Sequence, residues 1–303
     1  MTHIPPQSLE HFAPQKDFLV CVDSDGCVFD TMGIKQRECF CPWMIAYFDL
    51  QPVSEAAREC KVFADLFSKT RGANRHVTVK RILTELLPFH PQVKQRNFSV
   101  PQYPHYFAWV DNPESLLSNE GLHRAIDRAE TAEARAELEH VLAWSERVNW
   151  SVGEIVKGIP PFLGVNDCLE RLYEEADVVV VSATPIEALK REWSEHRIAH
   201  FARLICGQEQ GTKTEHIQET AKHYPANHVL MLGDAPGDLS AARANGILFY
   251  PVIPGEEDAS WEAFHHEGIA RFLEESYAGD YEARLIERFE GVLPEDPPWE
   301  GAP

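Results

Sequence analysis

Short apolar runs along this chain alternate with longer stretches of helical periodicity. The first run covers residues 17–22 and ends abruptly in the polar sequence Asp23-Ser24-Asp25-Gly26. A continuous apolar run bounded in this way is typical of a parallel strand that is buried on both faces. Later runs predict four more strands, at 177–181, 203–206, 228–232 and 247–250.

Helical patterns separate the later strands, and they lie at residues 162–175, 185–196, 212–223 and 235–245. Strands that alternate with helices of this length indicate right-handed βαβ units and a doubly wound parallel sheet. The pattern therefore predicts an α/β protein with a Rossmann-like core. Two more helices are expected at 259–277 and 281–289, before an acidic, proline-rich tail.

About 150 residues with almost no strand signal separate the first predicted strand from the second, far more than a βα connection requires. Helical patterns fill most of this insertion, at residues 34–48, 53–67, 77–87 and 113–148, and a proline- and aromatic-rich stretch at 88–113 interrupts them. We therefore expect an inserted, mostly helical cap domain. It would cover residues 32–157, and the core domain would consist of residues 1–31 and 158–303.

Composition and charge limit the classes of partner that the protein could bind. The formal net charge of −20 opposes binding to nucleic acid or to an anionic membrane surface. No apolar run approaches the ~20 residues that span a bilayer. The first fifteen residues lack the basic and apolar regions of a signal peptide, and the seven scattered cysteines fit a reducing cytoplasm. We expect a cytoplasmic protein, and the sequence leaves its oligomeric state open.

Polar side chains follow the predicted strands where each strand ends, which is where open parallel sheets bind ligands. Four carboxylates, one hydroxyl and one ammonium would converge there, from Asp23, Asp25, Asp234, Asp238, Ser182 and Lys213. Such a set is tolerable only around a cation and an anion together, and its oxygen ligands favour Mg²⁺. A carboxylate that attacks phosphorus, with a second one two residues away, could supply nucleophilic and acid–base catalysis.

Each of these features has an ordinary explanation when it is taken alone. An Asp-x-Asp-Gly sequence is usually a turn, a serine after a strand often caps a helix, and a lysine at a helix start is usually solvated. The placement of all of them at strand ends, in this order, favours the functional interpretation.

Four segments that carry these residues resemble the motifs of the haloacid dehalogenase superfamily. They are FLVCVDSDGCVFDT, VVVVSATP, GQEQGTKTEHI and VLMLGDAPGDLSAARANG, in chain order. The resemblance implies that Asp23 is a nucleophile that forms an aspartyl-phosphate. Asp25 would act as the general acid and base, and its backbone carbonyl would join the carboxylates of Asp23 and Asp234 on Mg²⁺.

The same resemblance assigns the remaining motif residues. Ser182 and Lys213 would hold the phosphoryl oxygens, and Ala183 would contribute to substrate binding. Asp238 would orient Lys213 or a metal-bound water, or ligate the metal itself. Asp25 argues against the metal-independent dehalogenases and against the carbon–phosphorus hydrolases, which usually have alanine at its position.

The position of the insertion resembles the helical C1-type cap of phosphoglycolate-phosphatase-like and β-phosphoglucomutase-like members. Residues 70–76, Thr-Arg-Gly-Ala-Asn-Arg-His, resemble the substrate-specificity loop of those enzymes, in which an arginine contacts the distal part of the substrate. This implies substrate contacts from Arg75 first, and then from Arg71, Asn74 and His76. The segment 88–148 has no counterpart that we can place.

Three functions are compatible with these residues. The first is a Mg²⁺-dependent phosphomonoester hydrolase that acts on a small soluble phosphorylated metabolite. The second is a phosphosugar mutase of the β-phosphoglucomutase type, which would return the phosphoryl group to the sugar. The third is a non-enzymatic binding protein on a phosphatase scaffold, and it is the least favoured because no motif residue is lost.

Overall fold

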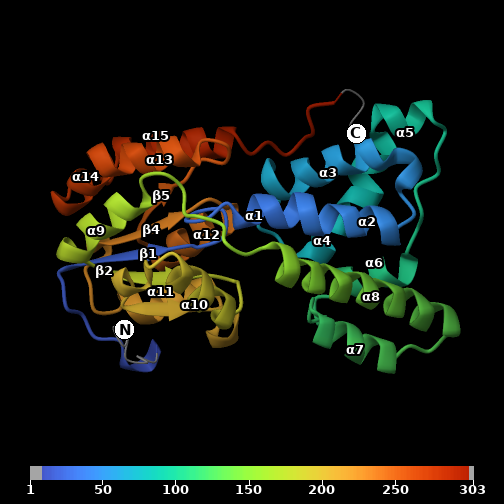
Figure 1. Ribbon diagram of the computed structural model, residues 1–303, viewed down its shortest axis with the longest axis horizontal. Coiled ribbons are helices and arrows are strands. Elements are labelled where there is room, and N and C mark those ends of the chain that lie inside the picture. The colour runs from blue at the N-terminus through green and yellow to red at the C-terminus, as the bar shows by residue number, and fades with distance from the viewer. Residues whose placement is uncertain (1–8, 300–303) are drawn as a thin grey trace. The chain divides into compact units, whose positions relative to one another are not determined.

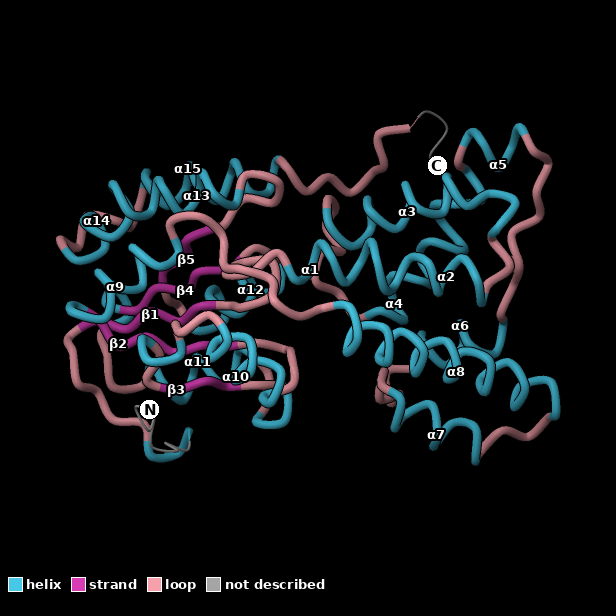
Figure 2. Tube along the Cα trace, viewed as in Figure 1, coloured by secondary structure: helices cyan, strands magenta, loops and turns pink. Residues whose placement is uncertain are grey.

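The computed structural model describes residues 9–299, and its core is a single parallel sheet (Figure 2). Five strands lie in the order β3-β2-β1-β4-β5. They are β1 (Phe18–Val22), β2 (Ala176–Val181), β3 (Leu204–Cys206), β4 (Val229–Gly233) and β5 (Leu248–Pro251). The predicted α/β class is confirmed, and all five strands lie close to the predicted positions. The N-terminal residues 1–8 and the last tail residues lie outside the described part of the chain.

The strand order places the end of β1 next to the end of β4. The chain leaves β1 for β2 and β3 on one side, and then returns to β4 and β5 on the other side. The backbone N–H of Asp23 donates to the carbonyl of Leu232 at 3.0 Å, which extends the pairing one residue beyond β1. In such sheets the reversal of strand order opens a crevice at the carboxyl ends of the strands.

Helices cover both faces of the sheet because the strands carry apolar side chains on both faces. Val20 and Val22 belong to the buried cluster that includes Leu169 and Trp261, whereas Cys21 on the opposite face approaches the hydroxyl of Thr220. The helices of this unit are α9 (Val165–Glu175), α10 (Ile186–Glu195), α11 (Lys213–Ala221), α12 (Pro236–Asn245), α13 (Glu257–Ala263), α14 (Ile269–Leu273) and α15 (Asp280–Gly291).

The chain divides into two compact units. The first comprises residues 1–32 and 158–292, and the second comprises residues 33–157 together with the chain from Leu293 onward. The second unit is helical (Figure 1). After the short helix α1 (Thr31–Ile34) come α2 (Cys41–Tyr47), α3 (Ser54–Leu66), α4 (Arg75–Arg81), α5 (Pro91–Gln95), α6 (Pro104–Asp111), α7 (Asn119–Asp127) and α8 (Ala132–Ile155).

Two features of the helical unit differ from the expectation. The proline-rich stretch 88–113, which we expected to interrupt the helices, contains the short helices α5 and α6, each of which begins with a proline. We also expected the core to extend to residue 303, but Leu293–Trp299 group with the helical unit. Leu293 is buried, and Trp299 packs against Phe63 of α3.

Aromatic side chains form the centre of the helical unit. Phe48, Tyr106 and Trp144 are buried and contact one another or His76 edge to face. Full burial of side chains of this size contributes roughly 2–3 kcal/mol each. No helix among residues 9–299 is both long enough and apolar enough to cross a lipid bilayer.

Candidate active site

The loop after β1 turns sharply and directs Asp23 and Ser24 to opposite sides. The N–H groups of Val28 and Phe29 both donate to the carbonyl of Ser24, and Gly26 adopts a φ of 82°, which glycine tolerates best. The buried indole of Trp193 donates to the hydroxyl of Ser24 at 3.1 Å. Ser24 is thereby fixed within the core, and Asp23 lies on the other side of the strand.

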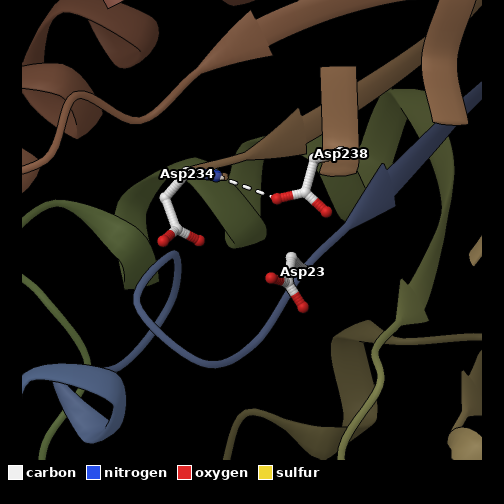
Figure 3. Close-up of side chains that lie close together, drawn as sticks. All are labelled: Asp23, Asp234 and Asp238. Atoms are coloured by element: carbon white, nitrogen blue, oxygen red, sulfur yellow. Dashed lines mark hydrogen bonds between the residues drawn. The ribbon is translucent and has the colours of Figure 1, made fainter. Parts of the chain in front are cut away.

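The turn between β4 and α12 supplies two more buried aspartates. One carboxylate oxygen of Asp238 accepts the N–H groups of Asp234 at 3.2 Å and Ala235 at 3.1 Å (Figure 3). A Cβ at Gly233 would lie only 2.4 Å from the Cβ of Asp238, so this position requires glycine. Asp238 lies in the first turn of α12, where the helix dipole stabilises negative charge.

Lys213 joins these aspartates to Asp23. Helix α11 begins at Lys213 because Thr212 and Glu215 form a capping box around its first turn. The ammonium group lies 2.7 Å from one carboxylate oxygen of Asp23 and 2.5 Å from the second oxygen of Asp238. Lys213 is therefore positioned to hold the carboxylates of two different segments at one place.

Three buried carboxylates and one ammonium make this cluster strongly negative. Oxygens of Asp23, Asp234 and Asp238 all lie within 4.8 Å of one another (Figure 3). The pKa of Asp23 is raised to about 8, first by burial and also by the charges of Asp238 and Asp234, while Lys213 opposes the rise. Burial opposes the charge of Lys213, but Asp23 and Asp238 outweigh this effect and raise its pKa. With every group charged, the cluster would carry two uncompensated negative charges.

The cluster fits a divalent cation. The second carboxylate oxygen of Asp23 is buried and has no hydrogen-bond partner among residues 9–299, although such an atom is costly to leave unpaired. Carboxylate oxygens are the ligands that Mg²⁺ prefers, and two positive charges would neutralise the excess. Both oxygens of Asp238 already accept hydrogen bonds, one from Lys213 and the other from two backbone N–H groups.

Asp25 is held by two threonines that the sequence did not single out. The hydroxyl of Thr184 donates to one of its carboxylate oxygens at 2.5 Å, and the hydroxyl of Thr31 donates to the other. The two threonines lie in the first and second motif segments, so their position was a signal that could have identified them. Together they fix the orientation of the Asp25 carboxylate.

The serine of the second motif also lies at this edge of the sheet. Ser182 is buried directly after β2, and its N–H donates to the carbonyl of Cys206 on β3 at 3.1 Å. Its hydroxyl accepts the N–H of Thr184 at 3.3 Å. Ala183, between them, is exposed. The structure thus gives Asp23, Asp25, Ser182, Lys213, Asp234 and Asp238 positions after strands or at helix starts of the first unit.

Three of the predicted cap residues have clear contacts inside the helical unit. Asn74 is the N-cap of α4 and accepts the N–H of His76 at 2.9 Å. His76 is buried against Tyr106, and its burial lowers its pKa to about 3, so the ring stays neutral. Arg71 is also buried and donates to the carbonyl of Leu66 at 2.8 Å. Their role in substrate binding stays a prediction.

Arg75 differs from these residues because only one edge of its guanidinium is occupied. One terminal nitrogen donates to the hydroxyl of Ser145 at 3.2 Å and to the amide oxygen of Asn149 at 2.7 Å. The guanidinium also stacks over the ring of Phe40, 4.6 Å from its centroid. In the described part of the chain, the Nε atom and the other terminal nitrogen donate to no protein group.

Comparison with known proteins gives matches of fold only. No family model matches the chain, and no curated protein matches it. Among solved structures, a putative phosphoglycolate phosphatase from Lactobacillus delbrueckii subsp. bulgaricus is 15% identical, with a TM-score of 0.48, over 83% of this chain and 92% of that one. A haloacid dehalogenase-like hydrolase from Streptococcus pneumoniae is 12% identical, with a TM-score of 0.42, over 84% and 98%.

A third match is the putative hydrolase YfnB from Bacillus subtilis, whose structure is described as bound to magnesium. It is 12% identical over 78% of this chain and 86% of that one, with a TM-score of 0.37.

Proposed function

We propose that this protein is a Mg²⁺-dependent phosphatase, a hydrolase that acts on a small soluble phosphorylated metabolite through an aspartyl-phosphate intermediate. The observation that carries the proposal is the buried group of three aspartates, of which Asp23 and Asp238 share the ammonium of Lys213, where the strand order reverses. This arrangement is costly unless a cation and a phosphate complete it. Phosphoryl transfer depends mainly on such positioning and charge stabilisation.

The metal ion would be held by the carboxylates of Asp23 and Asp234 and by the backbone carbonyl of Asp25. When bound, Mg²⁺ supplies positive charge that offsets the repulsion between these carboxylates and the phosphate. Asp238 would keep Lys213 in place, since its two oxygens accept hydrogen bonds from Lys213 and from backbone N–H groups.

In the first step, a carboxylate oxygen of Asp23 attacks phosphorus, and the bond between phosphorus and the ester oxygen breaks. Asp25 donates its proton to the leaving oxygen, which departs as an alcohol. In the second step, Asp25 accepts a proton from water as the water attacks the aspartyl-phosphate, and phosphate leaves. Ser182 and Lys213 would bind the phosphoryl oxygens in both steps, while Thr31 and Thr184 orient Asp25.

We further propose that the enzyme works in the cytoplasm. All seven cysteines lie in the described part of the chain, and each is buried and unpaired. Unpaired thiols suit a reducing compartment. The net charge of −20 disfavours nucleic acid and anionic membranes as partners.

The direct test is a screen of phosphorylated metabolites for phosphate release in the presence of Mg²⁺. We expect release from at least one small phosphate ester. Interconversion of a phosphosugar without net phosphate release would select the mutase instead. Binding of phosphorylated compounds without turnover of any of them would select the binding protein.

We propose that Arg75 recognises the part of the substrate that is not transferred. Replacing Arg75 with lysine keeps the charge but removes the planar fork that pairs with a carboxylate or phosphate. We expect the KM for the best substrate of the screen to rise by about tenfold with little change in kcat, because uniform binding is lost. Steady-state kinetics would measure both constants.

The matched control for this prediction is Arg124→Lys. Arg124 lies on α7 of the same unit and forms an exposed ion pair with Glu120. The Arg124→Lys variant should have the KM of the wild type. An unchanged KM in Arg75→Lys as well would remove Arg75 from the substrate-binding residues.

A further inference from the structure

The last described residues form a segment that groups with the helical unit and begins at a buried leucine. This C-terminal segment, Leu293–Trp299, begins two residues after the end of α15 and reaches α3 (Figure 1). At its start, Leu293 is buried. At its end, the ring of Trp299 packs against Phe63 and His90, with ring centroids 5.6 Å and 4.9 Å apart.

Between Leu293 and Trp299, the backbone of the segment bonds to the loop 67–74, which carries Arg71 and leads into α4 and Arg75. The carbonyl of Pro294 accepts the N–H of Lys69 at 3.2 Å. The carbonyl of Glu295 accepts a hydrogen bond from the guanidinium of Arg81 at 2.6 Å. The segment therefore occupies hydrogen-bonding groups on the loop itself and on the helix that follows it.

Arg81 connects the segment to the loop through a single side chain. One terminal nitrogen donates to the hydroxyls of Ser68 at 3.2 Å and Thr70 at 2.8 Å, while the other donates to Glu295. The Arg81 side chain is only 11% exposed, and its bonds to Ser68 and Thr70 are partly buried, whereas its bond to Glu295 is exposed. Both hydroxyls in turn donate to the carbonyl of Ala64, which fixes the start of the loop on α3.

We propose that the C-terminal segment and Arg81 form a latch that positions the loop 67–74 for substrate recognition. The proposal rests on the proposed function insofar as that loop contacts the substrate. Loops with few buried apolar contacts open readily, and external bonds of this kind raise the cost of opening. An intact latch keeps the loop and the adjacent Arg75 preorganised, and this preorganisation strengthens binding without altering the chemical step.

The test compares two substitutions, Arg81→Gln on α4 and Trp299→Ala in the C-terminal segment. Trp299 is partly exposed at the end of the segment, so its removal should leave the helical unit folded. Hydrogen exchange of residues 67–74, measured by mass spectrometry, should become about tenfold faster in both variants. Because either substitution releases the same latch, the double variant should exchange no faster than the faster single variant.

Kinetics provide the second readout. For the best substrate of the screen, KM should rise by about fivefold or more in both variants while kcat stays within about twofold. Phenyl phosphate is a probe ester with no polar group beyond the phosphate. Both variants should hydrolyse it at the rate of the wild type. Arg124→Gln on α7, far in sequence from the loop, is the matched control and should match the wild type in both assays.

Several results would overturn the latch. One is wild-type exchange of residues 67–74 in both variants, and another is purely additive acceleration in the double variant. A third is an equal loss of activity on phenyl phosphate and on the metabolite, which would mean that the segment only stabilises the fold. If the wild type releases phosphate from no ester, the proposed function fails, and hydrogen exchange alone still decides whether the latch exists.

Discussion

Replacing Asp23 with asparagine is expected to lower phosphate release by roughly four orders of magnitude or more, because the amide cannot form the covalent intermediate. The substitution conserves the shape of the side chain and removes one of three crowded negative charges. The melting temperature should therefore stay the same or rise, which separates loss of chemistry from loss of fold. Rates with saturating Mg²⁺ and thermal melts would measure the two effects.

The covalent intermediate itself can be observed. Acid quenching of the wild-type enzyme during turnover should trap phosphate on the peptide that contains Asp23, and Asp23→Asn should lack it. Asp30→Asn is the matched control, because Asp30 is an exposed aspartate just beyond the same turn. Equal rates in the wild type and Asp23→Asn would disprove the mechanism, because Asp23 is the residue that forms the covalent bond in it.

Removing the metal ion is expected to have the second largest effect. Chelation should abolish activity and lower the melting temperature, because the three crowded aspartates then have only Lys213 to offset their mutual repulsion. Mg²⁺ should restore both properties. Ca²⁺ should restore activity poorly, since it prefers more ligands at longer distances. Activity and melting temperature would be measured across a titration with each ion.

Asp234→Asn tests whether the ion binds at this cluster. The variant should lose most of its activity and most of the stabilisation by Mg²⁺. Glu219→Gln, an exposed acidic side chain of α11, should behave as the wild type. Full activity after exhaustive chelation, or an undiminished response of Asp234→Asn to Mg²⁺, would rule out the proposed metal site.

The positions of the strands and the residues at their ends could be predicted from the sequence. Parallel strands buried on both faces need continuous apolar runs, and such runs as 18–22 and 229–232 are visible without any knowledge of their partners. The polar residues that interrupt them, Asp23 and Asp234, necessarily lie at the same edge of a parallel sheet. The core of the candidate site followed from this local pattern.

Local patterns misled at the proline-rich stretch and at the C-terminus. Proline both interrupts helices and begins them, so the sequence 88–113 gave no means of recognising α5 and α6. The acidic tail likewise showed no sign that Leu293 and Trp299 would pack in the helical unit. Its partners, Phe63 and Arg81, lie more than two hundred residues earlier in the chain.

The sequence by itself determined where the strands lie along the chain and which aspartates follow them. A strand that is buried on both faces needs a run of consecutive apolar residues, and such a run can be recognised locally. Only the tertiary structure decided which charges meet. Lys213 reaches both Asp23 and Asp238, and Thr31 and Thr184 share the carboxylate of Asp25. These contacts depend on strand register and helix placement across distant segments, which no local periodicity encodes.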